Sequence, residues 1–470
     1  MSGIARRARV SGREQAPQAL SPSRRTIRAL HRLAALAFLA PALAASQGAR
    51  LPSSALREDL AAFRAIIAGD KAYTADARGQ VQRRLAVLEA ALDTVSVAWF
   101  ELELTRLVAL ADNGHSNAQA ASRSTRFNRI ALRLTPLGDG FHVLRARGPL
   151  ADLLGARLVA IDERGVDEVR HIVHTLTGGT DGWRDRFVPY AFESPQQLHA
   201  LGVAREPGAA TYRFALGDGR LVDRRLVADA PDANRPRNGT ARWMFPDVAL
   251  PNEGPGWRSL LAREAAPWAL QDIGEPFRWR EIPELHAVHI ELRQTANAPG
   301  RPIAEFLARV ESEIRQRKPT HAIVDLRING GGDLNTTRAF MMRLPSLVPG
   351  RIFALTSPYT FSAAISGLGY LEQAAPDRVT IVGELVGDRL MFFAEGGSAT
   401  LPNTGIVIGR ATERHDYATG CRPFPDCHPS VVQHAIAVKS LAPDIVARWT
   451  IEVYRAGRDP GLEAIAAILR

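Results

Sequence analysis

Three kinds of feature are scarce in this sequence, and each shortage excludes a class of protein. The chain has only three lysines, at positions 71, 318 and 439, so its positive charge is carried almost entirely by arginine. Beyond the first 44 residues, no apolar run approaches the roughly 18 residues of a membrane-spanning helix. Two cysteines, Cys421 and Cys427, are too few for a dense disulfide scaffold or a zinc site built from several thiolates. We therefore expect a soluble mature protein with an ordinary hydrophobic core.

The residues that are present fit a globular protein of several domains. A chain of 470 residues with 46% hydrophobic and 23% charged residues is too long for one ordinary core. The net charge of +10 at first suggests a nucleic-acid partner. Residues 1–44, however, contain eight arginines and one acidic residue, which leaves 51 basic and 48 acidic residues in the remainder. We therefore expect no nucleic-acid partner.

The N-terminus is typical of an export signal. Four arginines between positions 24 and 32 precede an apolar run at 33–40, and a small-residue site follows at 42–44. We predict a signal peptide at 1–44 and a periplasmic or secreted protein without a stable membrane anchor after cleavage. An N-terminal helix with a basic start is the alternative. In an oxidising compartment, Cys421 and Cys427 are candidates for a disulfide that closes a small loop. We expect no metal site, although His415 and His428 lie nearby in the sequence.

Four segments follow the predicted signal peptide. Residues 45–124 have apolar residues every three or four positions, which predicts a helical segment. Residues 125–230 have short alternating runs between turn residues, which predicts a mostly β module. Residues 231–282 are rich in proline, glycine and tryptophan without periodicity, so we expect a linker or a surface excursion. Residues 283–470 alternate strand and helix patterns, which predicts an α/β core.

Two turns of this α/β core are candidates for chemistry. The strand predicted at 321–326 is followed by a glycine-rich turn at 329–333. The strand predicted at 352–356 is followed by a turn at 357–360 and a helix that starts near Phe361. In open α/β sheets, ligands bind at the edge formed by the carboxyl ends of the strands. We therefore expect both turns at the functional edge of the sheet.

Ser362 is the candidate nucleophile in the second turn. A serine at a helix N-terminus lies beside unpaired backbone N–H groups, which stabilise an oxyanion. The N–H of Ala363 and a glycine N–H of the neighbouring turn would form that site. The alternative is that Thr360 or Ser362 only caps the helix.

Five motifs in order give a resemblance to a known family. They are Asp-Leu-Arg-Ile-Asn-Gly-Gly-Gly at 325–332, Thr-Phe-Ser-Ala-Ala at 360–364, Ile-Val-Gly-Glu at 381–384, Leu-Pro-Asn-Thr-Gly at 401–405 and Gly-Arg-Asp-Pro at 457–460. Their order and spacing resemble the S41 peptidases, which include the C-terminal processing (tail-specific) proteases and the tricorn core proteases. The resemblance implies a crotonase-like (ClpP/crotonase) α/β catalytic core at 283–470, an N-terminal helical segment and a PDZ-like β module at 125–230.

The resemblance also implies roles for single residues. Ser362 would be the nucleophile, and the N–H groups of Ala363 and Gly331, or less favourably Gly330, would form the oxyanion hole. The processing proteases use a lysine base after the Gly-Glu pair, but the stretch from 383 to 390 has none. Its arginine cannot replace the lysine, because a guanidinium keeps its proton at working pH.

The missing lysine favours the tricorn branch, in which a histidine before the PDZ module is the base. His115, in the turn Asn-Gly-His-Ser at 113–116, resembles that histidine and is the predicted base, with Ser116 beside it. A surface loop histidine is the alternative, and His415 is a competing base.

The acid that supports the base does not align cleanly with the family. We predict Asp416, with Glu395 and Asp426 as alternatives. The catalytic set expected from the sequence is therefore Ser362, His115 and Asp416.

The prediction from the sequence is an exported serine endopeptidase that needs no cofactor and acts on a peptide or protein substrate. An inactive S41-like protein that binds a peptide or ligand is the alternative from a different class. An esterase with the same serine is a third possibility, which the lack of a Gly-x-Ser-x-Gly elbow disfavours.

Overall fold

The computed structural model describes residues 51–470 apart from 235–239, 247, 249–254 and 423. The signal peptide predicted at 1–44 lies outside the described residues. Within them, no helix is both long and apolar enough to cross a bilayer.

The described chain begins with three helices, as the apolar spacing predicts: α3 (Ser53–Ala68), α4 (Ala75–Ala91) and α5 (Val97–Ala109). The side chains of Leu56, Leu60 and Phe63 recur on one face of α3 and are buried. Thr74 and Ser96 begin α4 and α5 by accepting hydrogen bonds from backbone N–H groups of the first turn.

The β module follows and contains a seven-stranded sheet with the main order β1-β2-β3-β5-β6. Its strands are β1 (Leu132–Leu137), β2 (Gly140–Arg147), β3 (Arg157–Ile161), β4 (Arg164–Gly165), β5 (Ala209–Ala215), β6 (Leu221–Val227) and β7 (Trp257–Ser259). Its helices are α6 (Val166–His174), α7 (Asp181–Asp185), α8 (Val188–Phe192) and α9 (Pro195–Ala200). Apolar side chains of the strands pack against α6, α8 and α9 in one core. Most strands of this sheet lie within residues 125–230, and the PDZ-like character of the module stays a prediction.

Residues 231–282 differ from the predicted linker. Two stretches in this range are strands: β7 pairs with β2 of the module, and β8 (Phe277–Ile282) pairs antiparallel with the first strand of the α/β core. The prediction missed them because β7 has only three residues and β8 carries charged side chains among apolar ones. This segment therefore joins both sheets.

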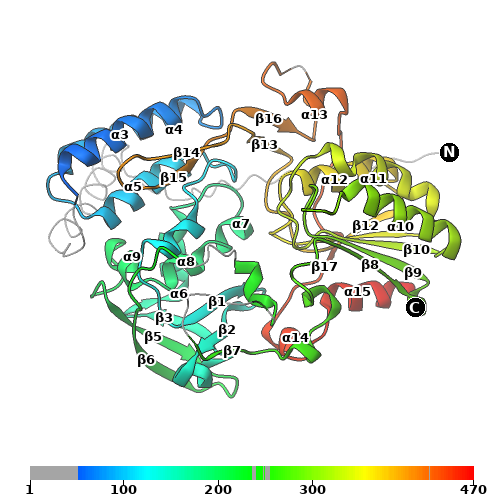
Figure 1. Ribbon diagram of the computed structural model, residues 1–470, viewed down its shortest axis with the longest axis horizontal. Helices are drawn as coiled ribbons and strands as arrows, with labels where there is room; N and C mark the ends of the chain where they lie inside the picture. Colours follow the sequence, from blue (N-terminus) through cyan, green and yellow to red (C-terminus); the bar gives the residue numbers. More distant parts are fainter. Residues whose placement is uncertain (1–50, 235–239, 247, 249–254, 423) are drawn as a thin grey trace, which may run out of the picture. The chain divides into compact units, whose positions relative to one another are not determined.

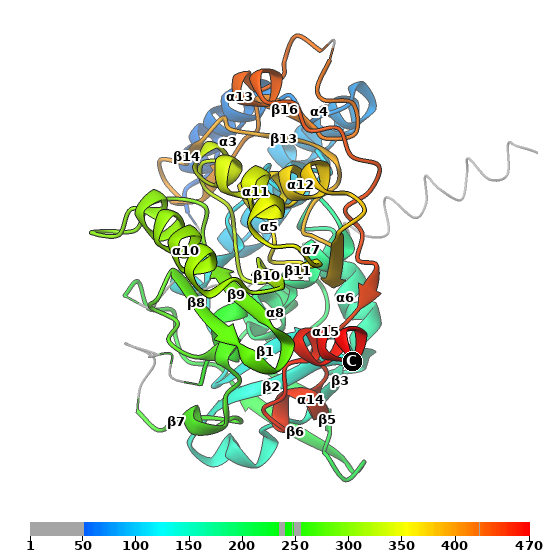
Figure 2. The same ribbon diagram turned by 90° about the vertical axis from the view of Figure 1, so that its right-hand side faces the viewer.

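The α/β core contains a six-stranded sheet in the order β17-β12-β11-β10-β9-β8, in which only β8 is antiparallel. The remaining strands are β9 (Ala287–Leu292), β10 (His321–Asp325), β11 (Ile352–Thr356), β12 (Val379–Gly383) and β17 (Ile445–Val446). Figures 1 and 2 show α10 (Ile303–Arg317), α11 (Asn335–Leu347) and α12 (Ala363–Ala374) on one face and α15 (Pro460–Leu469) on the other. Strands covered on both faces are buried along their whole length and mostly apolar, as β11 is.

A ribbon of short strands extends from the core to the N-terminal helices (Figure 1). Its strands are β13 (Met391–Ala394), β14 (Ser398–Thr400), β15 (Val407–Gly409) and β16 (Glu413–Asp416), and the short helices α13 (Pro429–Gln433) and α14 (Ile451–Arg455) follow. Asn117, which follows α5, exchanges backbone hydrogen bonds with Gly409 at 3.2 and 2.7 Å. Asp59 of α3 accepts hydrogen bonds from the backbone N–H groups of Asn403 and Thr404 at 2.8 Å each. The ribbon thus fixes the loop after α5 against the core.

Candidate active site

Ser362 lies between β11 and α12 in an uncommon backbone conformation. Its φ and ψ are 54° and −126°, which an L-residue with a side chain rarely adopts. Its side chain makes no capping hydrogen bond to the helix. Backbone strain of this kind persists only where the surroundings enforce it, and it is concentrated at functional sites. A capping role therefore does not explain the serine.

Hydrogen bonds hold the serine loop, residues 357–362, against the neighbouring glycine turn at 329–333. The Thr360 hydroxyl donates to the carbonyl of Leu326 at 2.8 Å. The N–H of Phe361 donates to the carbonyl of Asn329 at 3.0 Å. Both acceptors follow β10, which pairs in parallel with β11. The two turns therefore meet at the carboxyl edge of the sheet, as the sequence predicts.

Below the glycine turn, Arg327 bridges two buried carboxylates. Its guanidinium donates to Asp325 at 2.6 Å and to Asp459 at 2.8 and 2.9 Å. Burial opposes ionisation of Asp325, but the charges of Arg327 and His289 outweigh it and lower the pKa of the carboxyl. Asp459 also accepts from the first N–H groups of α15. The Gly-Arg-Asp-Pro motif at 457–460 thus supplies a residue that holds the glycine turn in place.

The glycine turn approaches Ser362 where no side chain would fit. Gly331 has φ +100°, and a Cβ on it would lie 2.6 Å from the Ser362 Cβ and 3.0 Å from the backbone N of Ala363. The Gly331 N–H donates to the Asn329 side-chain oxygen at 2.9 Å, so this predicted oxyanion donor is already engaged. Within the described part of the chain, the N–H groups of Gly330 and Ala363 have no hydrogen-bond acceptor.

His115 lies in the loop after α5, between two aromatic rings. Its ring centroid is 4.3 Å from that of Phe361 and 5.2 Å from that of Phe392, and both pairs are stacked. Phe361 is the neighbour of Ser362 in the chain, and its other face stacks on Trp183 of α7 at 3.6 Å. A Cβ on Gly114 would lie 2.8 Å from the Phe361 ring, so the loop passes close to the serine turn.

The carboxylate beside His115 is that of Asp388, which no sequence motif predicts as the acid. Asp388 Oδ2 lies 3.6 Å from His115 Nδ1, and the two side chains are 1% and 16% exposed. Asp388 Oδ1 accepts from the N–H of Arg389 at 2.9 Å. Among the described residues, Asp388 Oδ2 and both ring nitrogens of His115 have no hydrogen-bond partner. No hydrogen bond joins His115 to Ser362 in this conformation.

Asp416, the predicted acid, does not meet His115. Its carboxylate accepts from Arg414 at 3.3 Å and from the N–H groups of Ala418 and Thr419 at 3.2 and 3.1 Å. In the β13–β16 pair, Asp416 is opposite Met391, one residue away from the pair of Phe392 and His415. Because side chains alternate along a strand, Asp416 points away from the face that stacks toward His115. In this structure the predicted acid therefore does not lie beside His115.

The other candidates also form separate contacts. Glu395 Oε1 lies 2.9 Å from His415 Nε2, and His415 Nδ1 lies 3.0 Å from the hydroxyl of Tyr417. Burial lowers the pKa of His415. The ring of Phe392 separates His415 from His115. Asp426 contributes its carbonyl to the N–H of Arg414. His415 therefore does not replace His115 as the histidine beside the serine turn.

Two further sequence expectations concern lysine and cysteine. All three lysines are exposed, and the nearest in sequence to the Gly-Glu pair, Lys439, lies well after it. Cys421 and Cys427 form a disulfide. Among the residues described, no group of three histidine, cysteine or carboxylate side chains is arranged to hold a metal ion.

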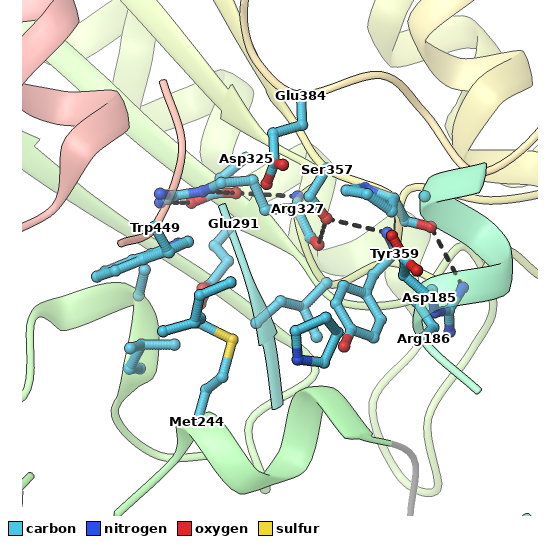
Figure 3. Close-up of a pocket in the computed structure, with 17 residues that line it drawn as sticks. Asp185, Arg186, Met244, Glu291, Asp325, Arg327, Ser357, Tyr359, Glu384 and Trp449 are labelled. Atoms are coloured by element: carbon cyan, nitrogen blue, oxygen red, sulfur yellow. Dashed lines mark hydrogen bonds and ion pairs between the residues drawn. The ribbon is translucent and has the colours of Figure 1, made fainter. Parts of the chain in front are cut away.

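A cavity of about 110 Å³ borders the loop that leads to Ser362 (Figure 3). Its wall includes Ser357 and Tyr359 of that loop, Arg327 below the glycine turn, and Asp185 and Arg186 of the module's α7 segment. Glu384, after β12, also faces it, and burial raises the pKa of this carboxyl. The cavity thus lies between the module and the core, next to the loop that positions Ser362.

No protein-family model and no curated protein matches the sequence. Among solved structures, mature CPAF is similar at 13% identity and a TM-score of 0.56, covering 88% of this chain and 97% of that chain. A complex of mature CPAF with lactacystin is similar at 12% identity and a TM-score of 0.53, covering 88% and 98%. A photosystem II D1 C-terminal processing protease matches at 13% identity and a TM-score of 0.38, covering 89% and 98%. At such identities the similarity shows the fold alone, so the chain has the mixed α/β fold of mature CPAF over most of its length.

Proposed function

We propose that this protein is a serine endopeptidase in which Ser362 is the nucleophile, His115 the general base and Asp388 the residue that orients the base. Three observations carry the proposal: Ser362 is strained, the ring of the adjacent Phe361 stacks on His115, and the ring nitrogens of His115 and the Oδ2 atom of buried Asp388 have no hydrogen-bond partner among the described residues. Buried polar groups are nearly always bonded, so such a cluster needs a reason. Catalytic hydrogen bonds are often long in free enzymes and tighten when substrate binds.

In this proposal, the two nitrogens of His115 have different partners. Nδ1 faces Asp388, which leaves Nε2 for the hydroxyl of Ser362. In the first step, the Ser362 oxygen bonds to the carbonyl carbon of the peptide while its proton passes to His115 Nε2. His115 then gives that proton to the leaving amine, and a water molecule activated in the same way hydrolyses the acyl-enzyme.

The oxyanion hole in this proposal uses Ala363 and Gly330. Their N–H groups have no acceptor in the described chain, whereas the Gly331 N–H is bonded to Asn329. Gly331 contributes by lacking a Cβ, which would otherwise collide with Ser362. This changes the donor expected from the sequence from Gly331 to its neighbour.

The finer features of the proposal follow from the resemblance and the composition. The core is crotonase-like, and the β module is PDZ-like and presents peptide by strand addition. The protein is exported to the periplasm or secreted, which the Cys421–Cys427 disulfide supports, because disulfides persist in oxidising compartments.

A fluorophosphonate probe, which reacts with activated serines, tests the proposal. We expect wild type to be labelled and Ser362→Ala to be unlabelled, with labelling nearly lost in His115→Ala. Ser366→Ala is the matched control, because Ser366 lies one turn further along α12 and bonds to Tyr417 instead. A folded wild type that takes no label would contradict the proposal and favour the inactive binding protein. Labelling with hydrolysis of esters but no peptides would favour an esterase.

A further inference from the structure

Strand β6 forms one margin of the β module's sheet. Among the described residues, no strand pairs with its far side, and Figure 1 shows it as the outermost strand. The odd-numbered side chains of β6 are exposed, whereas Leu226 is buried. Leu221 is 60% exposed and Val227 is 67% exposed, which is unusual for large apolar residues at the two ends of one strand. Within the described part of the chain, strand β6 therefore has one unpaired edge, and it exposes apolar side chains to solvent.

The backbone of β6 has its odd-numbered residues turned toward this free edge. Ala228 donates to the carbonyl of Gly208 at 3.0 Å, and Leu216 donates to the carbonyl of Arg220 at 2.9 Å. Because hydrogen-bonded pairs alternate along an antiparallel ladder, the even-numbered residues of β6 bond to β5. The N–H and C=O groups of Leu221, Asp223, Arg225 and Val227 then point outward.

The sequence of β6 is complementary to itself when one copy is reversed. When residues 221–227 of two copies run antiparallel about a two-fold axis at Arg224, Asp223 lies opposite Arg225 and Leu221 lies opposite Val227. Each of these pairs then occurs twice. These are the residues whose backbone groups point outward, so the same register aligns backbone hydrogen bonds, opposite charges and apolar contacts. Opposite charges and apolar pairs directly across a ladder are stabilising.

The existing ion pairs of β6 are compatible with this register. Arg224 would lie beside its own copy, but its guanidinium already bonds to Asp152 at 2.9 Å, which offsets the repulsion. Asp223 pairs with Arg213 on β5, and Arg225 pairs with Glu206. Both pairs are exposed, so their side chains remain accessible to a second chain.

We propose that β6 is a self-association edge: two copies of this chain pair antiparallel through residues 221–227, about a two-fold axis at Arg224, and join their two sheets. A closed two-fold pair uses the free edge completely, which is a stable way to protect it. The occupant is a second copy because the same sequence supplies both charge pairs reciprocally.

Sedimentation velocity over a range of protein concentrations tests this with a charge-reversal cycle. Wild type should dimerise, and Asp223→Arg or Arg225→Asp alone should weaken the dimer roughly tenfold or more, because each places like charges opposite one another twice. The double variant should restore it. Within one chain, the double variant sets Arg213 beside a new cation and Glu206 beside a new anion, so recovery can come only from the partner chain.

Control variants distinguish an effect of strand register on the dimer from an effect of net charge. Asp218→Arg and Arg220→Asp make the same charge changes in the exposed turn before β6 and should leave the dimer unchanged. A wild type that stays monomeric up to about 0.1 mM would overturn the proposal. Single variants that dimerise as wild type, or a double variant that does not recover, would also overturn it and would favour a foreign peptide as the occupant of this edge.

Amide hydrogen exchange gives an independent reading. The N–H groups of Val222, Arg224 and Leu226 should be protected at all concentrations because they bond to β5. Those of Asp223 and Arg225 should become protected only as the concentration rises. Equal exchange of both sets at all concentrations would contradict the pairing.

Discussion

Two histidines lie on opposite faces of Phe392, and they differ in their hydrogen bonds. His415 has both ring nitrogens engaged, one by Glu395 and one by the hydroxyl of Tyr417. His115 has neither nitrogen engaged within the described chain, although Asp388 lies 3.6 Å away. The first arrangement holds a fold together, because buried polar groups that are bonded add rigidity. The second keeps a proton acceptor available, which is what a general base requires.

The largest effect should come from replacing His115, whose ring nitrogens have no hydrogen-bond partner in the described chain. We expect His115→Ala to slow fluorophosphonate labelling of Ser362 by about 10³-fold or more. His415→Ala should slow labelling less than about tenfold while lowering the free energy of unfolding by about 1–3 kcal/mol, because it removes one hydrogen-bond partner from Glu395 and one from the Tyr417 hydroxyl. Equal losses of labelling in the two variants would end the distinction between them.

Asp388 and Asp416 give a second comparison of the same kind. Asp388→Asn should slow labelling on the order of 10²–10⁴-fold, since the imidazole loses the group that orients it. Asp416→Asn should label as wild type does, because its carboxylate bonds to Arg414 and two backbone N–H groups. Labelling kinetics of both variants measure this directly. A slow Asp416 variant beside a fast Asp388 variant would restore the acid expected from the sequence.

A buried and fully bonded carboxylate should matter for stability. Asp459→Asn replaces one carboxylate partner of Arg327 by a neutral amide whose NH2 group cannot accept from the guanidinium, and should cost about 3–5 kcal/mol of unfolding free energy in urea titrations. Glu463→Gln is the matched control on the same helix, because its pair with Arg458 is exposed and should contribute about 0–1 kcal/mol. Similar midpoints for the two variants would show that the network around Arg327 adds little.

The smallest effect should appear as a pH dependence. Burial raises the pKa of Glu291 to about 7 despite the nearby charges of Arg293 and Arg278. The folded chain therefore binds this proton more tightly than the unfolded chain, whose carboxyl has a pKa near about 4.3. This contribution to stability is full below that value and is lost as the pH rises to about 7. Glu291→Gln should flatten the fall in urea stability across this window, and an unchanged slope would assign the pH dependence to other groups.

The sequence predicted the meeting of the glycine turn and the serine turn better than it predicted the acidic residue beside His115. The glycine turn and the serine turn follow apolar strands of the parallel sheet, so their meeting at one edge follows from strand order alone. Asp388 stands in the stretch at 383–390, where the family pattern places a lysine, so that pattern assigns it no role. Its position in a loop after β12, at the same edge as both turns, is the signal that identifies it.

Other parts depended on contacts that no local pattern reveals. The choice between the N–H groups of Gly330 and Gly331 as oxyanion donor depends on one hydrogen bond, which the Asn329 side chain accepts from Gly331. The exclusion of Asp416 depends on which face of a four-residue strand it occupies. Strands β7 and β8 were missed because each becomes a strand only through its partner in a sheet.

The bonds between Asn117 and Gly409 have a consequence for the timing of synthesis. On the proposed roles, the base leaves the ribosome first, the nucleophile much later and the aspartate later still. The loop of His115 is fixed only after the segment that contains Gly409 has been made. A growing chain therefore carries no working peptidase until most of it has been translated, which protects it, and its neighbours at the site of synthesis, from premature cleavage.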